Sequence, residues 1–442
     1  MRQPFSRSAV LATAVVTALL AAGCTGTPAS QAPADASAPV TIKFWHGWSQ
    51  PHEVAAIQAN IKAFEKLHPN ITVVSTPNVT DDKLLQGIRS GSGPDVVSSF
   101  TTDNVGLFCN GALTDLNPLL QKAGIDKNAV FVKTMVDYTQ YQGKQCTLPL
   151  LGDAMGLYYN KAMFAAAGIA SPPKTWSQFS ADAVKLTKSR GDSYSQLGFM
   201  PNYHGYNTTP GHYLAQYGPS YFTPDGKANL ANDPAVTTFL KDQQNLVKAL
   251  GGYTKLEKYR ATFGDEYSTQ NAFEAKKVAM QLDGEWRLAN LKQDKVAFPY
   301  AAAPMPVADD RADTYGAGYV TGTVAGISAT SQHQAAAWEF LRFLTTDTNA
   351  LVTFANAINN IPSTVAALKS PQLLQDPTFQ TFVKIAGNPD SQTTPASPNG
   401  GQYQTILADF AYKVEAGKVQ EIQAGLRDVD RQIDTATAQA QG

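Results

Sequence analysis

VTIKF (residues 40–44) is the stretch from which the fold can be read, because a helix pattern and a second strand pattern follow it closely. Its apolar residues alternate with polar ones, as in a half-buried β-strand. Apolar residues then recur at spacings of three and four over residues 54–67, a helical period that Pro69 ends. Residues 71–74 give the next strand pattern. A strand, a helix and a strand in this order predict parallel pairing within an α/β domain.

The same alternation continues along the chain. Thr175 and Gln178 match a capping box, which predicts a helix from residue 176 whose first turn is capped by side chains. No repeat of fixed period occurs. Further patterns predict strands at residues 94–97 and 156–159, and helices at residues 83–89, 235–250, 335–345, 403–414 and 419–433.

Length, composition and charge limit the possible classes of protein. The chain has 442 residues, which is enough for two or three domains, and its apolar fraction of 43% allows a large core. Its 35 basic and 36 acidic residues nearly cancel. This balance gives no electrostatic reason to expect binding of nucleic acid or of an anionic membrane surface.

Two cysteines, Cys109 and Cys146, remain after Cys24 near the start of the chain. In an oxidising compartment such an even pair predicts a disulfide, worth about 3–4 kcal/mol in the chain-entropy model. Two reduced buried cysteines are the alternative. A metal site is disfavoured because neither cysteine has a ligand at C-x-x-C spacing.

The first residues predict export from the cytoplasm. Arg2 and Arg7 precede an uncharged apolar run, residues 9–22, which is too short to span a membrane, so residues 1–23 fit a signal peptide. LAAGC (residues 20–24) resembles the lipobox of bacterial lipoproteins, which implies that Cys24 is lipidated and anchors the chain to the cell membrane. The alternative is an ordinary secretory signal with a chance cysteine. Residues 24–39, rich in Ala, Pro, Ser and Thr, fit a flexible tether.

Six stretches resemble, in order, the family 1 extracellular solute-binding proteins, which are the sugar-capturing lipoproteins of bacterial ABC importers. The resemblance implies a receptor that binds a carbohydrate and delivers it to the permease subunits in the membrane. It would work as a monomer and without a cofactor. The stretches are FEKLHPNITV (64–73), SGSGPDVV (90–97), GLYYNK (156–161), PPKTW (172–176), KVAM with GEW (277–286) and AWEFL (337–341).

The fold that this resemblance implies is a type II, periplasmic-binding-protein-like pair of α/β lobes joined by crossing hinge segments. Lobe one would contain residues 40–151 and 296–355, and lobe two residues 152–295 and 360–442. The crossings would lie near Leu151-Gly152, Phe298-Pro299 and Asn359-Ile361, whose Gly, Pro and Asn suit a hinge. The ligand would sit between the lobes, beyond the carboxyl ends of strands.

A sugar offers a C–H ring face for aromatic side chains and hydroxyl groups for hydrogen bonds. After the first strand, Trp48 is a candidate for stacking, with packing in the core as its alternative. His46 is a possible donor, and Gly47 would let a ligand approach the backbone.

Polar residues after later strands complete the first wall of the expected cleft. Phe100, Thr101 and Asp103 follow the strand near residue 97, and a helix cap is the alternative role for Asp103. Asp153 resembles the family position where a carboxylate bridges two ligand hydroxyls; an exposed turn residue is its alternative.

The second half of the chain supplies the remaining candidates. Trp286 matches the cleft tryptophan of the family, with Glu285 beside it, and a core tryptophan at a hinge is the alternative. Gly316 would give access to the backbone near Tyr319. A loop with the right chemistry for a second wall, or for a plain turn, contains Asn202, Tyr203, His204 and Tyr206.

Motifs for enzymes fail at defined positions. His52-Glu53 begins like a zinc-protease helix, but Ala56 stands where the second histidine is required. Asp283 and Glu285 are two apart on one strand, so they do not flank a glycosidic bond as a pair ~5–10 Å apart would. We therefore expect a binding protein with no catalytic residue, metal or cofactor. The alternatives are the same fold binding a polyol phosphate, peptide or chelate, and an extracellular carbohydrate-active enzyme.

Overall fold

The strand and helix patterns at the start of the chain fold as predicted in the computed structural model, which describes residues 38–201 and 208–441. The first strand buries Ile42 and Phe44 and exposes Lys43 between them, so its alternation decides which face packs inward. It pairs in parallel with the next two strands. These elements are β1 (Val40–Trp45), α1 (Pro51–Leu67), β2 (Ile71–Thr76), α2 (Asp81–Arg89) and β3 (Val96–Ser99).

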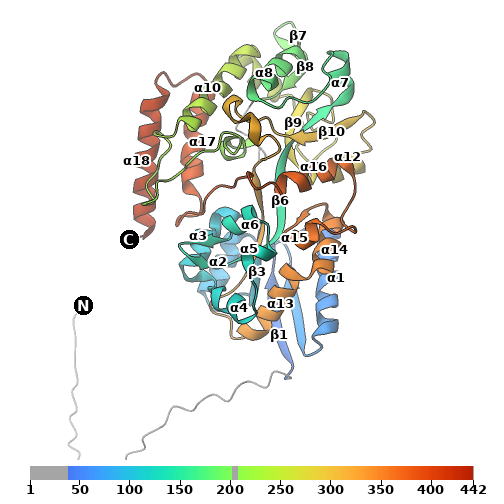
Figure 1. The fold of residues 1–442 in the computed structure, drawn as a ribbon, viewed down its shortest axis with the longest axis vertical. Helices are drawn as coiled ribbons and strands as arrows, with labels where there is room; N and C mark the ends of the chain where they lie inside the picture. The colour runs from blue at the N-terminus through green and yellow to red at the C-terminus, as the bar shows by residue number, and fades with distance from the viewer. Residues whose placement is uncertain (1–37, 202–207, 442) are drawn as a thin grey trace, which may run out of the picture. The chain divides into compact units, whose positions relative to one another are not determined.

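One long strand, β6 (Leu148–Asn160), runs through the centre of the main sheet (Figure 1). Its first half pairs antiparallel with β11 (Val320–Ile327). Its second half pairs antiparallel with β9 (Val278–Gly284) and β10 (Tyr300–Pro304). The sheet order is β2-β1-β3-β11-β6-β9-β8-β7, with β7 at Lys188–Arg190 and β8 at Ser193–Phe199.

The parallel pairing predicted from strand–helix alternation is confirmed for β1, β2 and β3, and it also joins β8 to β9. It is wrong for the centre of the sheet, where β6 pairs antiparallel with β9, β10 and β11. Alternation describes neighbouring elements, whereas these partners lie more than a hundred residues apart. Local sequence therefore carries no signal for their direction.

The chain returns from the β9 half of the sheet to the β1 half at Val320, where β11 begins. Before that point, Val307 bridges to Thr175 on the β9 half. This crossing is later than Phe298-Pro299, which the sequence suggested. The proline there marks a turn into β10, and a turn does not show which half the next strand joins.

The last crossing also follows the predicted one. β12 (Ile361–Pro362) pairs with β6 at Leu151 and Gly152, and α15 (Val365–Leu368) packs against α14 (Thr348–Ile358). α16 (Pro377–Ala386) then packs on β6 and β10. The chain therefore leaves the β1 half between residues 369 and 377, after the Asn359-Ile361 stretch.

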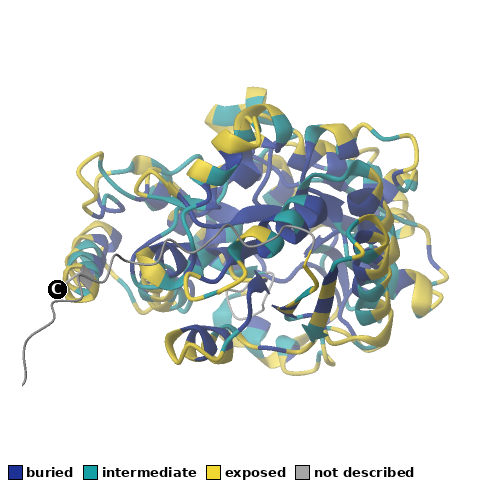
Figure 2. Cartoon of the chain, turned by 90° about the horizontal axis from the view of Figure 1, so that it is seen from below, coloured by how far each residue is buried: buried dark blue, intermediate teal, exposed yellow. Residues whose placement is uncertain are grey.

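Two apolar clusters form the core. One gathers around β1, α1 and α14, and the other lies around β8 and β9. Figure 2 shows the outer helix faces exposed over a largely buried interior. The other helices and strands are α3 (Val105–Leu107), α4 (Asn117–Lys122), α5 (Lys127–Val130), α6 (Lys133–Asp137), β4 (Gln140–Tyr141), β5 (Lys144–Gln145), α7 (Lys161–Ala166), α8 (Trp176–Lys185), α9 (Pro210–Leu214), α10 (Pro234–Ala249), α11 (Tyr253–Arg260), α12 (Arg287–Gln293), α13 (Gln334–Thr346), α17 (Gln402–Glu415) and α18 (Ile422–Gln441).

The later helices are confirmed, since α10, α13, α17 and α18 occupy the predicted stretches. The capping box before α8 is wrong in its geometry. Thr175 is the N-cap residue but its side chain accepts no capping hydrogen bond, and Gln178 accepts one from the N–H of Lys174 at 2.9 Å. The predicted Cys109–Cys146 disulfide is present, with Cα atoms 5.2 Å apart. No helix within residues 38–201 and 208–441 combines the length and apolar character needed to span a membrane.

Candidate functional site

The centre of the candidate site is a pair of carboxyl groups at the point where β6 changes partners. Asp153 lies on β6 opposite Thr321 of β11, and Glu285 follows directly on β9. The Nδ2 group of Asn360 donates to Oδ1 of Asp153 and, at 3.2 Å, to Oε1 of Glu285. The N–H of Ala154 donates to the other Glu285 oxygen at 3.0 Å. Segments from both halves of the sheet therefore meet at these two carboxyls.

The surroundings of the pair oppose ionisation. Glu285 is completely buried, and desolvation together with the adjacent Asp153 carboxyl raises the pKa of Glu285 well above its ordinary value. Desolvation also raises the pKa of Asp153, although hydrogen bonds from Glu285 and Asn360 act in the opposite direction. The buried pair therefore resists carrying two negative charges at once.

Trp286 stands beside this pair, on the turn between β9 and α12. Its half-buried indole lies against Gly284, where a Cβ would fall 2.1 Å from the ring, so only glycine leaves room for it. The indole Nε1 has no hydrogen-bond partner among the described residues. Behind the turn, the buried Arg287 guanidinium pairs with Asp283 at 2.6 Å. This ion pair fixes the turn that carries Glu285 and Trp286.

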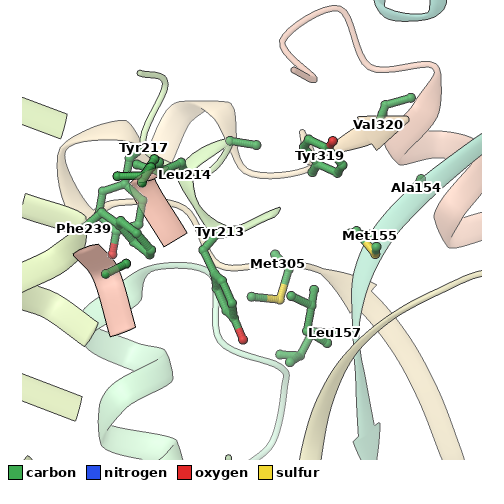
Figure 3. Packing of buried hydrophobic residues seen from close by; sticks show 14 of the residues in the cluster. Ala154, Met155, Leu157, Tyr213, Leu214, Tyr217, Phe239, Met305, Tyr319 and Val320 are labelled. Atoms are coloured by element: carbon green, nitrogen blue, oxygen red, sulfur yellow. The ribbon is translucent and has the colours of Figure 1, made fainter. Parts of the chain in front are cut away.

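Tyr319 lies next to the same stretch of β6. Its carbonyl accepts the N–H of Met155 at 3.0 Å, and Figure 3 shows its ring in the buried cluster near that strand. The Tyr319 hydroxyl shares a 3.0 Å hydrogen bond with Thr394, and the ring centroid lies 4.6 Å from that of His212. Gly316 lies in the loop before Tyr319 with φ at 116°, a conformation that favours glycine.

Tyr138 and Gln216 are buried near this stretch and carry unpaired polar atoms. Tyr138 lies at the end of α6, close enough to Asp153 and Tyr319 for their charges, after burial itself, to raise its pKa well above 10. Neither the Tyr138 hydroxyl nor the Gln216 amide finds a hydrogen-bond partner among residues 38–201 and 208–441. Buried polar groups usually are paired, so these two are available to a ligand or to water.

Asp103 reaches this region from the β1 half. Its Oδ1 accepts a hydrogen bond from Nε2 of Gln404 at 2.5 Å, and Thr394 also bonds to it. Burial raises the pKa of Asp103. The neighbouring Thr102 hydroxyl lies 3.0 Å from that of Thr321, which is the strand partner of Asp153. The Asp103 side chain therefore joins two distant segments and does not cap a helix.

Trp48, His46 and Gly47 belong to the packing around β1. Trp48 is 2% exposed and meets the ring edges of Phe354 and Phe100, with centroids 5.0 and 5.3 Å away. His46 is fully buried, and desolvation lowers its pKa to about 4. A Cβ on Gly47 would fall 2.6 Å from the Phe100 ring. These contacts favour the packing role for Trp48 and leave Phe100, 45% exposed, as the accessible aromatic surface here.

Of the remaining residues that the sequence suggested for the site, only Thr101 lies within the described residues. Thr101 is exposed beside Phe100. Four residues of the aromatic loop and the proposed lipidation residue lie outside the described residues: Asn202, Tyr203, His204, Tyr206 and Cys24.

Several residues that the fold brings to the site carry no local signal in the sequence. Asn360 lies in a stretch whose residues predict only a crossing between lobes. Gln404 and Thr394 gave no signal, because they meet Asp103 across about three hundred positions of the chain. Tyr138 follows a short helix and has no local pattern that marks it.

The chemistry of the described residues favours binding by hydrogen bonds. They contain no group of three or more His, Cys, Asp or Glu side chains that could hold a metal ion. A separate hollow of about 1110 Å³ lies among α4, α13 and the α15 region, lined by Leu119, Trp338 and Lys369, and shares no lining residue with the carboxyl pair. The site is therefore defined by its polar side chains and not by that hollow.

The family of bacterial extracellular solute-binding proteins matches residues 48–351. The chain belongs to this family. Two solved structures share its fold. The sugar-binding protein MalE of Xanthomonas citri has a TM-score of 0.75 at 19% identity, covering 91% of this chain and 98% of that one. CpMnBP1 with mannotriose bound has a TM-score of 0.73 at 24% identity, covering 89% and 99%.

A sequence relative spans most of this solute-binding protein as well. The maltotriose-binding protein of Pyrococcus abyssi (strain GE5 / Orsay) is 22% identical over 363 residues, which cover 81% of this chain and 74% of that protein. The mixed α/β, two-lobed fold expected from the sequence is thereby confirmed.

Proposed function

We propose that this solute-binding protein is the extracytoplasmic receptor of a bacterial ABC importer, which binds a carbohydrate between its lobes and passes it unaltered to the permease. The observation that carries the proposal is the meeting of Asp153, Glu285 and Asn360 beside the Trp286 indole. Carboxyl and amide groups suit paired sugar hydroxyls, and an indole suits a sugar ring face.

The strand pairing supports a proposal for the extent of each lobe. Lobe one would comprise residues 40–151 and 320–369, and lobe two residues 155–319 and 377–441. Asp103 and Phe100 would line the site from lobe one, and Glu285, Trp286 and Tyr319 from lobe two. A ligand that contacts both lobes would favour the closed state, since its differential affinity shifts the equilibrium.

Carbohydrate is the favoured ligand class for two reasons. The names of the proteins similar to this one include a maltotriose-binding protein and a sugar-binding protein. A phosphate ligand would call for free cationic groups, whereas the Arg287 guanidinium at this turn is paired with Asp283.

Transport without bond chemistry also fits the carboxyl geometry. A glycosidase holds its two carboxyls ~5–10 Å apart across the scissile bond. Asp153 and Glu285 instead both accept from one amide nitrogen of Asn360, which leaves no space between them for a glycosidic linkage. At the chain start, residues 1–23 would direct export, and a lipid on Cys24 with the tether of residues 24–39 would hold the receptor monomer at the membrane.

The test is calorimetric titration of the purified protein with maltotriose, mannotriose and a panel of mono- and disaccharides, followed by chromatography of the mixtures. We expect saturable binding of at least one sugar and its recovery intact. Shortened products would indicate an enzyme. If no sugar gives a heat of binding but glycerol phosphate or a peptide does, the ligand is not a carbohydrate.

A further inference from the structure

We infer that Asp153 and Glu285, which Asn360 holds together, share a proton, and that closure of the two lobes depends on this proton. The inference rests on the proposed lobe arrangement and adds a positioning residue and a control by pH. Asn360 acts through the two carboxyls and needs no contact with the ligand.

Asn360 is a donor shared by the two carboxyl groups. One amide nitrogen of Asn360 donates to an oxygen of each carboxyl, so both carboxyl groups lie around a single atom. The second oxygen of Glu285 is occupied by the N–H of Ala154 at 3.0 Å. Two ionised carboxylates around one amide nitrogen repel each other in this buried position, and a proton on one of them removes that repulsion.

No positive charge near the two carboxyls balances a second negative charge among the described residues. The hydrogen bonds and ion pairs of the described residues bring no cation to Asp153 or Glu285. The ionisable groups that face the pair are Tyr138 from α6, Tyr158 on β6 and the Asp283–Arg287 ion pair behind the turn. Burial raises the pKa of both tyrosines further above 10, and the Arg287 charge is already matched by Asp283. The shared proton is therefore the main relief of repulsion between the two carboxyls.

The two carboxyls lie where the proposed lobes join. Asp153 lies in the short part of β6 between the two lobes and pairs there with Thr321 of lobe one, whereas Glu285 directly follows β9 of lobe two. If both carboxyls ionise, like charges in a buried setting repel each other, and repulsion between these anchors separates the lobes at the hinge. Asn360 lies just before β12, which also pairs with the lobe-one part of β6. The closed form thus takes up a proton that the open form can release.

Infrared difference spectroscopy of the ligand-free full chain tests the proton directly. At neutral pH, wild type minus Glu285→Gln should show the C=O band of a protonated carboxylic acid. Glu415→Gln, which changes a buried carboxyl on α17, is the control. The difference between wild type and this variant should lack the band of the Asp153–Glu285 pair, which disappears as pH rises. Asn360→Ala removes a hydrogen bond that lowers the pKa of Asp153, so it should move loss of the band to higher pH. The inference would be overturned if the band were absent, or if neither Glu285→Gln nor Asn360→Ala changed it.

Spin labels at Lys62→Cys on α1 and Lys258→Cys on α11, both exposed, test the movement. The label distance should lengthen as pH rises in the wild-type background and stay constant in the Glu285→Gln background. The same lengthening in both backgrounds would overturn the inference. Neither measurement contains a sugar, so failure to bind carbohydrate would contradict the proposed function and leave this result intact.

Discussion

Gln404 Nε2 donates to Asp103 Oδ1 at 2.5 Å, joining residues 301 positions apart in the sequence. Asp103 follows β3, and Gln404 lies in the first turn of α17. In the proposed lobe arrangement this bond connects lobe one to lobe two directly. It therefore contributes to closure whether or not either side chain touches the ligand.

Gln404→Ala should weaken sugar binding by about 1.5–3 kcal/mol, the scale for a hydrogen bond to a charged group. The reason is that the closed form loses a contact that the open form lacks. Calorimetric titration with the sugar identified in the binding panel measures the change. Gln402→Ala, an exposed change on the same helix, is the matched control. Equal affinities for the two variants would contradict a role in closure.

Gly106→Ala should lower the affinity for the sugar about tenfold or more, because the added methyl group keeps lobe one from approaching lobe two. A Cβ on Gly106 would fall 1.9 Å from the carbonyl oxygen of Ser397, so α3 and that segment must separate. The titration is run beside a thermal melt without ligand, which reports whether the variant still folds. Wild-type affinity in a folded variant would show that closure tolerates the displacement.

Trp286→Ala should lower affinity by about 1–3 kcal/mol, the scale for burying a large apolar side chain. The indole stands beside Glu285 with its Nε1 unpaired among the described residues. Trp176→Phe serves as control, since Trp176 packs within the core against Phe179, with the two ring centroids 5.1 Å apart. Trp176→Phe should change the melting temperature and leave the affinity for the sugar unchanged. A Trp286→Ala protein with wild-type affinity would remove this residue from the site.

His46→Phe should reduce the loss of stability in acid. Burial lowers the pKa of His46 to about 4, against 6.5 for the free side chain. Between these values the unfolded chain binds a proton that the folded chain does not, so stability falls as pH drops from 6.5 toward 4. The wild type should lose roughly 3 kcal/mol over this range through His46. Urea unfolding at pH 7.5 and pH 4.5 measures it, with the exposed His52→Gln as control. An unchanged pH dependence in His46→Phe would refute the assignment.

Replacing Cys109 and Cys146 together by serine should lower the free energy of unfolding by about 3–4 kcal/mol. The disulfide restricts the unfolded chain over a separation of 37 residues. Urea unfolding of the variant, and of wild type with and without reductant, checks the value. If reduction leaves the wild-type curve unchanged, the cross-link does not contribute to stability.

Several features could be predicted from the sequence because they depend on neighbouring residues. The alternation in VTIKF marks β1, and the three-and-four spacing before Pro69 marks α1. The family stretches led to the two-lobed fold, which the similar structures confirm. The cysteine pair gave the disulfide, since only two cysteines remained after Cys24. Asp153 and Glu285 were both singled out, but as separate candidates.

The tertiary structure alone decided how these parts meet. The antiparallel centre around β6, the late crossings, the burial of Trp48 and the joining of Asp153, Glu285 and Asn360 all involve residues far apart in the chain. Residue order fixes periodicity and local turns, because those arise from adjacent backbone and side chains. Which distant side chains share an amide donor, and which aromatic ring is covered by another helix, depends on packing that no local stretch contains.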